Sequence, residues 1–339
     1  MKRQRFLIGV VILFLLACQI PSLASPTPVP PTATWTSSPT ATLTSTATAT
    51  ATATATFTPT ITPTPLPLAR RVLILSIDGL RPDAIPMAPM QNVEALMAGS
   101  AYTFTAQTVY PSVTLIAHAS MLGGVCPSKH GVDWNDYLPD RGYAIGTDLF
   151  DLAHAAGMQT VMYVGKEKLR QLTEPSSTDV FTFINDRDLV IADQLIANFP
   201  QDFRLLFIHF ATVDDMGHEY GWMSPQQLNV AYRADQALGL ILAELDARGL
   251  RQETLIIVTA DHGGHETTHG SHLPEDMTIP WIANGAGIKP EQLTIQVHTM
   301  DTAATAAFAL GLPIPPEWDG VPVYEAFGLP VEKQSTGCQ

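Results

Sequence analysis

The sequence predicts an α/β protein with a largely parallel central sheet, helices on both faces and a disordered spacer in front. Four apolar runs have the continuous hydrophobicity of parallel strands buried on both faces: they are 72–77, 160–164, 205–210 and 255–259. Helical patterns follow, as at 225–248 and 300–310. Because strands and helices alternate, we expect one α/β domain from residue 69 to 330.

The first 25 residues have the pattern of a signal peptide. A short basic region at 2–5 precedes an apolar stretch at 6–17, which is short for a membrane span. The Leu-Leu-Ala-Cys18 sequence that follows resembles a lipoprotein cleavage box. We therefore expect an exported protein at the cell surface, lipid-anchored at Cys18 and tethered to the membrane through its N-terminus only. Cleavage after Ala24, or an uncleaved anchor, would also leave the domain outside the cytoplasm.

Residues 26–68 are predicted to be a disordered linker. They consist almost entirely of Thr, Pro, Ala and Ser, which cannot bury a core and which favour extended backbone. We interpret this segment as a spacer that holds the domain away from the envelope. A glycosylated stalk would have the same composition.

The charge of the chain limits its partners. The formal net charge is −14, and every acidic residue lies at Asp78 or beyond. This balance argues against a nucleic-acid-binding surface or a broad contact with anionic membrane. It does not exclude a small phosphorylated substrate, because bound divalent ions reverse the local field.

Three cysteines are few for an exported protein. If Cys18 carries lipid, Cys126 and Cys338 remain. We do not expect them to form a disulfide, because Cys338 lies in a polar tail, residues 331–339, beyond the last patterned segment.

Three of the predicted strands lead into acidic residues. The first runs into Asp78, the third into Asp214 with His218 one helical turn later, and the fourth into Asp261-His262. A single Asp after a strand is usually a helix cap. The carboxyl ends of parallel strands meet at one edge of the sheet, where ligands bind in such folds. Three such ends, two with a histidine, therefore favour a metal site.

A histidine-rich loop follows the last of these strands. It contains His265, His269 and His272, which would be solvated in isolation but are candidate ligands beside the carboxylates. Mixed carboxylate and imidazole ligands suit Zn²⁺, with Mn²⁺ or iron less favoured. Six ligands are enough for two divalent ions, which at about 3.5–4 Å apart can clamp the attacking and leaving oxygens of a phosphoryl displacement.

The segment 110–132 supplies a candidate nucleophile. Thr114 is predicted at a loop-to-helix junction, where the helix amides favour an anion. A threonine hydroxyl is a weak nucleophile at neutral pH unless a metal holds it as an alkoxide. From the residues alone, Ser112 or Ser120 would serve equally well.

Together these motifs resemble the alkaline-phosphatase superfamily, and more closely its type I phosphodiesterase/nucleotide pyrophosphatase branch. The resemblance extends from Arg70 to about Gly328. Its landmarks are Ser-Ile-Asp78-Gly-Leu-Arg, the 114–131 segment, Val-Asp214-Asp-Met-Gly-His218-Glu-Tyr-Gly and Thr-Ala-Asp261-His262-Gly-Gly.

The resemblance implies a role for each motif residue and makes 69–330 a metal-dependent phosphohydrolase domain. One ion would be bound by Asp78, Asp261 and His262, and the other by Asp214, His218 and His269. Thr114 matches the family's nucleophile, and Asn135 matches an asparagine that contacts the phosphoryl oxygen. His269 is preferred to His272 because the glycine that follows it fits the pattern.

Some residues depart from the pattern or remain open. Ile116 replaces a proline usual after the nucleophile. Lys166 and Lys168 are similar to basic phosphate contacts of some monoesterases in the superfamily, or else lie in a solvated loop. Asp215 is expected to be solvated or to support a ligand. The remaining histidines are predicted to be structural or superficial: His118, His130, His154, His209 and His298.

The leading hypothesis is hydrolysis of a phosphodiester or pyrophosphate bond through a phospho-Thr114 intermediate. A phosphomonoesterase with the same site is the first alternative, which the two lysines would favour. A non-catalytic surface binding protein on the same fold is the second. A sulfatase is disfavoured, because Cys126-Pro-Ser-Lys lacks the order of that branch's modified motif. Specificity is expected to depend on the loops 137–150 and 166–190.

Overall fold

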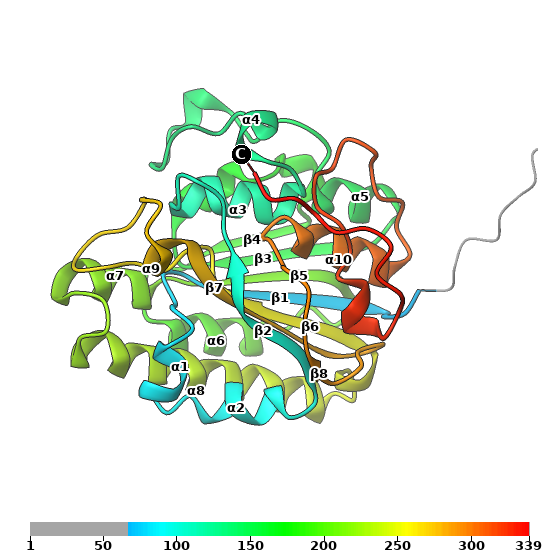
Figure 1. Cartoon of the computed structure of the whole chain (residues 1–339). Coiled ribbons are helices and arrows are strands. Elements are labelled where there is room, and N and C mark those ends of the chain that lie inside the picture. Colours follow the sequence, from blue (N-terminus) through cyan, green and yellow to red (C-terminus); the bar gives the residue numbers. More distant parts are fainter. Residues whose placement is uncertain (1–66, 339) are drawn as a thin grey trace, which may run out of the picture. The chain divides into compact units, whose positions relative to one another are not determined.

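An eight-stranded sheet runs through the described part of the chain, which in this computed structural model comprises residues 67–338 (Figure 1). Its strands are β1 Arg71–Ile77, β2 Ser100–Gln107, β3 Gln159–Val164, β4 Val180–Phe183, β5 Phe203–Phe210, β6 Thr254–Thr259, β7 Thr278–Gly285 and β8 Glu291–Gln292. The predicted signal peptide, Cys18 and nearly all of the predicted linker lie outside the described residues.

The strand order is β4-β3-β5-β1-β6-β7-β2-β8. Within the described residues, β7 alone runs antiparallel to its neighbours, β6 and β2, and every other pairing is parallel. The predicted largely parallel sheet is therefore confirmed, with one reversed strand that the sequence did not indicate.

The four strands predicted from their apolar runs form the middle of the sheet. All seven residues of β1 are buried, because β5 pairs along one side, β6 pairs along the other and helices cover both faces. Continuous hydrophobicity is what such an environment requires, since neither face of the strand meets water.

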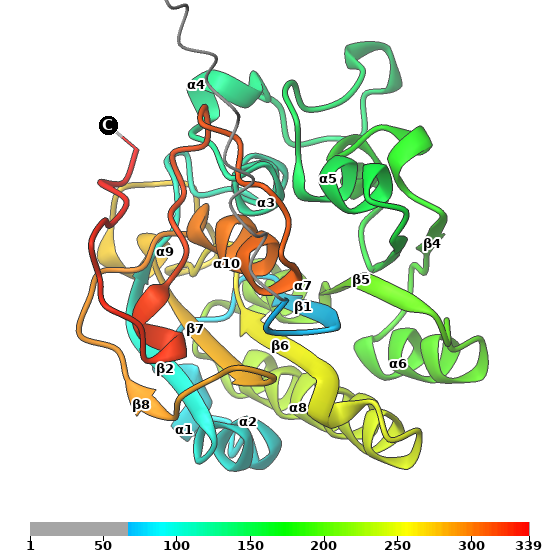
Figure 2. The same cartoon turned by 90° about the vertical axis from the view of Figure 1, so that its right-hand side faces the viewer.

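Two groups of helices cover the sheet (Figures 1 and 2). The helices are α1 Ala84–Met87, α2 Gln91–Met97, α3 Thr114–Gly123, α4 Pro127–His130, α5 Leu149–Ala155, α6 Asp188–Ala197, α7 Thr212–Tyr220, α8 Pro225–Ala247, α9 Pro274–Met277 and α10 Asp301–Leu310. Short 3-10 turns span Pro139–Arg141, Glu167–Gln171, Pro175–Ser177, Arg251–Glu253 and Tyr324–Phe327. On one face α8 packs against α2, α6 and α7, and on the other α10 packs against α3 and α5.

The two predicted helices have clear end signals. The Ser224 hydroxyl accepts a hydrogen bond from the Gln227 amide at 3.3 Å, and Pro225 occupies the first turn of α8. Gly311 adopts a left-handed conformation (φ 70°) directly after α10, which relieves the strain that a side chain would cause there. Both helices match their predicted ranges to within one residue.

The prediction that Cys126 and Cys338 stay unpaired is wrong. They form a disulfide, with their Cα atoms 5.5 Å apart. The C-terminal tail is partly exposed, but polar contacts hold it against the domain. Ser335 lies 2.7 Å from Nδ1 of His298, and its hydroxyl donates to Asp301 at 2.7 Å. Because these contacts are polar, the tail has no hydrophobic pattern from which its position, and hence the position of Cys338, could be predicted.

Within residues 67–338, no helix is both long enough and apolar enough to cross a membrane.

Candidate metal centre

The three strands that lead into predicted ligands are adjacent in the sheet. The order β5-β1-β6 places Asp78, at the end of β1, between the ends of the other two strands. Asp261 and His262 follow β6, and Asp214 lies in the first turn of α7, directly after β5. The strand order therefore agrees with the prediction that the three motifs meet at one edge of the sheet.

Asp78, Asp261 and His262 form what we call the buried cluster. All three are completely shielded from solvent. Nε2 of His262 lies 3.2 Å from Oδ1 of Asp78 and 3.4 Å from Oδ2 of Asp261. The Gly79 amide donates to the other Asp261 oxygen at 3.2 Å, which fixes the carboxylate against the end of β1.

Asp214, His218 and His269 form what we call the open cluster. One ligand atom from each lies within 4.8 Å of the others, and a second such group joins Asp78, Asp214 and His262. Asp214 therefore adjoins both clusters. His218 comes one turn after Asp214 on the same face of α7, whereas His269 comes from the loop after β6. The side chain of His218 is 46% exposed, unlike any residue of the buried cluster.

The histidines of both clusters are oriented by backbone carbonyls. Nδ1 of His262 lies 2.7 Å from the Gly263 carbonyl, and Nδ1 of His269 lies 2.8 Å from the Ser112 carbonyl. Nδ1 of His218 contacts the Thr267 carbonyl at 3.0 Å. A carbonyl can only accept, so each Nδ1 carries a hydrogen, and Nε2 is the ring nitrogen that faces the site. This is the usual support for a metal-binding imidazole.

The clusters fit divalent cations because several of their inward-facing atoms have no hydrogen-bond partner among residues 67–338. Nε2 of His218 and Nε2 of His269 face each other at 3.1 Å, close enough for one cation to be bound by both. Several buried atoms of the site lack any hydrogen-bond partner within the described residues: Asp78 Oδ1, Asp214 Oδ1, Asp261 Oδ2, His262 Nε2 and Thr114 Oγ1. Buried polar atoms are rarely left unpaired in proteins, so this concentration indicates a site built for ions.

The pKa values show an excess of negative charge at the centre. Burial, together with the nearby Asp78, raises the pKa of Asp261 to about 7. Burial acts to lower the pKa of His262, but the neighbouring carboxylates outweigh it and raise that pKa to about 9. A bound divalent ion would balance this charge and displace the His262 proton.

Lys166 supplies the positive charge nearest to this centre. Its ammonium lies 2.7 Å from Asp78 and 2.5 Å from Asp214. Burial opposes the charged form, but the two carboxylates raise the pKa of Lys166 above its ordinary value. The sequence left two alternatives for Lys166, a residue of the site or a residue of a solvated loop. Its contacts with Asp78 and Asp214 favour the first alternative.

Two histidines predicted to be structural support the buried cluster from behind. Nε2 of His209 contacts Asp78 at 3.0 Å, and burial lowers the pKa of His209 to about 4, which keeps it neutral. His118 lies 3.4 Å from Asp261, and its Nδ1 donates to the Thr114 carbonyl at 2.7 Å. No sequence pattern indicates these contacts, because the first depends on the register of β1 and β5 and the second on how α3 packs against the end of β6.

Thr114 is the first residue of α3 and is completely buried. Its hydroxyl has no hydrogen-bond partner within the described residues, although a buried threonine hydroxyl normally bonds to a carbonyl. His118 ties this turn to Asp261. By contrast, the Ser112 hydroxyl donates to the Ser271 carbonyl at 2.9 Å, and Ser120 contacts His130 at 3.1 Å. The geometry therefore favours Thr114 over both serines.

Asn135 lies beside the start of α3. Its carbonyl oxygen accepts hydrogen bonds from the Leu115 amide at 2.9 Å and from Lys168 at 3.1 Å. With this oxygen engaged, the side-chain NH₂ group of Asn135 remains for an anionic ligand. Burial and the charge of Lys166 lower the pKa of Lys168. The second predicted lysine is therefore also part of the site.

Several candidates lie outside the two clusters. The ring of His272 stacks on Tyr110 with a centroid distance of 3.6 Å, and neither ligand group includes it. Asp215 is exposed, which agrees with the first of its two predicted alternatives, a solvated side chain. His265 instead contacts Asp276 at 2.7 Å.

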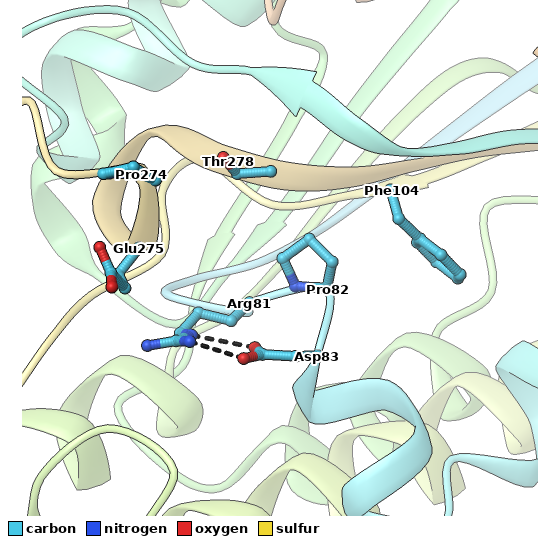
Figure 3. Close-up of a pocket in the computed structure, with 7 residues that line it drawn as sticks. All are labelled: Arg81, Pro82, Asp83, Phe104, Pro274, Glu275 and Thr278. Atoms are coloured by element: carbon cyan, nitrogen blue, oxygen red, sulfur yellow. Dashed lines mark hydrogen bonds and ion pairs between the residues drawn. The ribbon is translucent and has the colours of Figure 1, made fainter. Parts of the chain in front are cut away.

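A pocket of about 290 Å³ lies beside the loop that follows Asp78 (Figure 3). None of the candidate ligands lines it. Arg81 in its wall forms two bonds with Asp83, at 2.9 and 2.5 Å, and donates to the Gly264 carbonyl at 3.2 Å. The arginine of the Asp78 motif therefore braces the loop after His262 and does not face the metal centre.

The fold and the site together define a protein with candidate metal-binding groups at the carboxyl edge of a mainly parallel sheet. Residues 72–307 match the sequence profile of the type I phosphodiesterase / nucleotide pyrophosphatase family. The chain belongs to this family, as its motifs predicted.

Curated relatives are similar to the chain in sequence, and solved structures are similar to it in fold. GPI ethanolamine phosphate transferase 2, catalytic subunit, of Homo sapiens is 29% identical over 296 residues, which cover 79% of this chain and 29% of the relative. A murine ectonucleotide pyrophosphatase / phosphodiesterase 5, described as an inactive Thr-to-Ala variant in complex with AMP, superimposes with a TM-score of 0.65 at 15% identity. That match covers 77% of this chain and 99% of the other.

The wild-type alkaline phosphatase PafA has the same fold. It superimposes with a TM-score of 0.65 at 14% identity, over 78% of this chain and 100% of the other. The chain spans less than half the length of the curated relatives it matches first.

Proposed function

We propose that this protein is a two-metal hydrolase of phosphate esters that acts through a phospho-Thr114 intermediate and prefers a phosphodiester or pyrophosphate bond. The family assignment supports a phosphoric ester hydrolase. The observation that carries the proposal is the set of unpaired buried atoms, in which the Thr114 hydroxyl accompanies the ligand atoms of both clusters.

Zn²⁺ is the proposed metal, one ion for each cluster. Three carboxylates and three imidazoles suit Zn²⁺, and no thiolate contributes. When bound, the two ions would supply the positive charge that lowers the pKa of a hydroxyl and stabilises a leaving oxygen.

The residues of the chain would then perform an in-line displacement. The Thr114 oxygen attacks phosphorus from the start of α3, where the helix N-terminus favours the phosphoryl anion. The bond to the leaving oxygen breaks as the threonine ester forms, and the leaving group departs as an alcohol or a phosphate. Asn135 and Lys168 hold a non-bridging oxygen. Water then attacks the phosphothreonine from the opposite side, which restores Thr114 and releases the phosphoryl product.

The test is turnover by the Thr114→Ala variant at confirmed metal occupancy. We expect a loss of at least about 10³-fold in kcat, with the metal content unchanged. Thr114→Ser, which keeps a hydroxyl, should retain part of the activity. Wild-type turnover by the fully loaded Thr114→Ala protein would exclude the covalent route.

The monoesterase alternative has a specific observation in its favour. A monoester dianion needs more positive charge than a diester, and Lys166 and Lys168 both reach the site. A nitrophenyl monoester and a bis-nitrophenyl diester, compared on one preparation, decide between the two. A higher kcat/KM for the diester supports our proposal, whereas a higher value for the monoester supports the alternative.

The proposed location is the cell surface, with lipid at Cys18 as the only membrane tether. The Cys126–Cys338 disulfide supports an oxidising compartment outside the cytoplasm. If the lipid is the anchor, Cys18→Ser should move the protein from the membrane fraction to the medium, and retention of this variant in membranes would contradict it. The proposed substrate is a small phosphorylated molecule, since the net charge argues against a nucleic-acid-binding surface.

A further inference from the structure

Trp222 connects all three segments that carry the candidate ligands. It lies two residues beyond α7 and is 8% exposed. Its indole Nε1 donates to the Gly79 carbonyl at 2.9 Å, directly after Asp78. Its backbone amide donates to the Glu266 carbonyl at 2.6 Å, in the loop after β6.

The indole packs directly against a glycine in each of these segments. A Cβ atom added at Gly264 would lie 2.1 Å from the ring, and one at Gly217 would lie 2.8 Å from it. At Gly79 the closest ring atom would be 3.3 Å away. Gly79 follows Asp78, Gly217 precedes His218, and Gly264 lies two residues after His262. No side chain fits between the indole and the backbone at Gly217 or Gly264, so the ring sets the spacing of these segments.

The indole also contacts both imidazoles of the open cluster. The His218 ring meets it at 5.2 Å between centroids and 86° between planes, and the His269 ring meets it at 5.8 Å and 65°. Both are edge-to-face arrangements, which are favourable for aromatic rings. Each imidazole is therefore held at Nδ1 by a carbonyl and along its ring by Trp222.

Backbone strain is concentrated around Trp222. Within the described residues, Met223 (φ 64°) and Glu266 (φ 47°) are the only non-glycine residues with positive φ. One follows Trp222 and the other accepts the hydrogen bond from its amide. Gln227 stabilises Met223, because its side chain accepts from the Met223 amide at 2.6 Å. Such strain persists only where the surroundings enforce it, and it is typical of functional sites.

We propose that Trp222 is a positioning residue for the open cluster, which fixes His218 and His269 in the geometry that binds the second ion. The inference rests on the proposed two-metal function and deepens it. Because Trp222 touches no imidazole of the buried cluster, its loss should weaken the second ion far more than the first.

Trp318 provides a matched control. It is also buried, at 5% exposed, and also packs against a glycine, with a Cβ at Gly124 lying 2.5 Å from its ring. Its Nε1 donates to the Thr147 carbonyl at 2.9 Å. Trp318 therefore matches Trp222 in burial, glycine contact and hydrogen bonding, but it contacts no candidate ligand.

The experiment measures Zn²⁺ binding to the full chain by competition with a chromophoric chelator, without any substrate. Trp222→Leu should weaken the second ion by about 10–100-fold, the range for residues that orient metal ligands, and leave the first ion little changed. Trp222→Phe, which keeps an aromatic edge, should show a smaller loss. Trp318→Leu and Trp318→Phe should lower the melting temperature but change neither affinity.

Equal second-ion affinity in wild type and folded Trp222→Leu would overturn this inference alone. A wild-type protein that binds fewer than two ions would overturn the proposed function and this inference with it. If Trp222→Leu does not fold, the second-ion affinities of Trp222→Phe and Trp318→Phe are compared instead. A selective second-ion loss in the former supports the inference, and equal affinities in the two overturn it.

Discussion

Asp78, Asp261 and His262 are sealed from solvent at two strand ends, whereas His218 of the open cluster leaves 46% of its side chain exposed on a helix. The buried cluster is held by the sheet itself, with His209 and His118 behind it. The open cluster combines α7 with the loop after β6. Similar ligand chemistry is thus placed in a rigid environment and in an adjustable one, which suggests that the open side admits substrate.

The largest expected effect comes from removing one imidazole in each cluster. His262→Ala should lower kcat/KM by on the order of 10³-fold, because no solvent can replace a ligand that is completely buried. His218→Ala should cost roughly 10–100-fold, and excess Zn²⁺ should restore part of the activity, since water can enter at the exposed position. Titrating both variants with metal measures the difference. Equal losses with equal rescue would remove the distinction between the clusters.

The order of metal loss provides a second test. A chelator should remove the ion of the open cluster first, because His218 is accessible and the buried ligands are not. Metal content followed against chelator concentration should therefore show two steps, with activity lost in the first. A single step that removes both ions together would show that the clusters are one unit.

The smallest expected effect concerns the support of the open cluster. Asp188 is buried and accepts hydrogen bonds from the Ala211 and Thr212 amides, at 3.0 and 3.3 Å, three and two residues before Asp214. Burial raises the pKa of Asp188 to about 7 from an ordinary value of about 3.8. Between these values the folded protein binds more protons than the unfolded chain, so the contribution of Asp188 to stability falls as pH rises.

Asp188→Asn removes this titration and keeps an acceptor for the two amides. The variant should lose less stability than wild type between about pH 5 and pH 8, by about 2 kcal/mol, because one pKa unit corresponds to about 1.4 kcal/mol. Denaturant unfolding at several pH values measures the difference. Parallel pH profiles for the two proteins would show that Asp188 does not titrate in this range.

The sequence predicted the part of this site that depends on local order along the chain. A buried strand followed by Asp is readable at β1, and parallel pairing then places Asp78 between the other strand ends. Asp214 and His218 share a face because of helical spacing. His269 could be distinguished from His272 only through the family pattern, and its approach to His218 agrees with that choice.

What the sequence did not reveal depends on long-range packing. His209 reaches Asp78 because Ser76 pairs with His209 across β1 and β5, a register that one sequence does not specify. Trp222 follows an ordinary helix end, and the glycines against which its indole packs leave no pattern of their own. The disulfide was missed for the same reason, since Cys338 is placed by a tail that lacks hydrophobic periodicity.

The most direct test of the central claim is to look for the covalent intermediate itself. Metal-loaded protein is quenched in acid during turnover of a bis-nitrophenyl diester, and its peptides are mapped by mass spectrometry. We predict a phosphoryl-bearing adduct located at Thr114 itself. The adduct should be absent from the Thr114→Ala variant. Full turnover with no adduct at Thr114, or an adduct at another residue, would contradict the account.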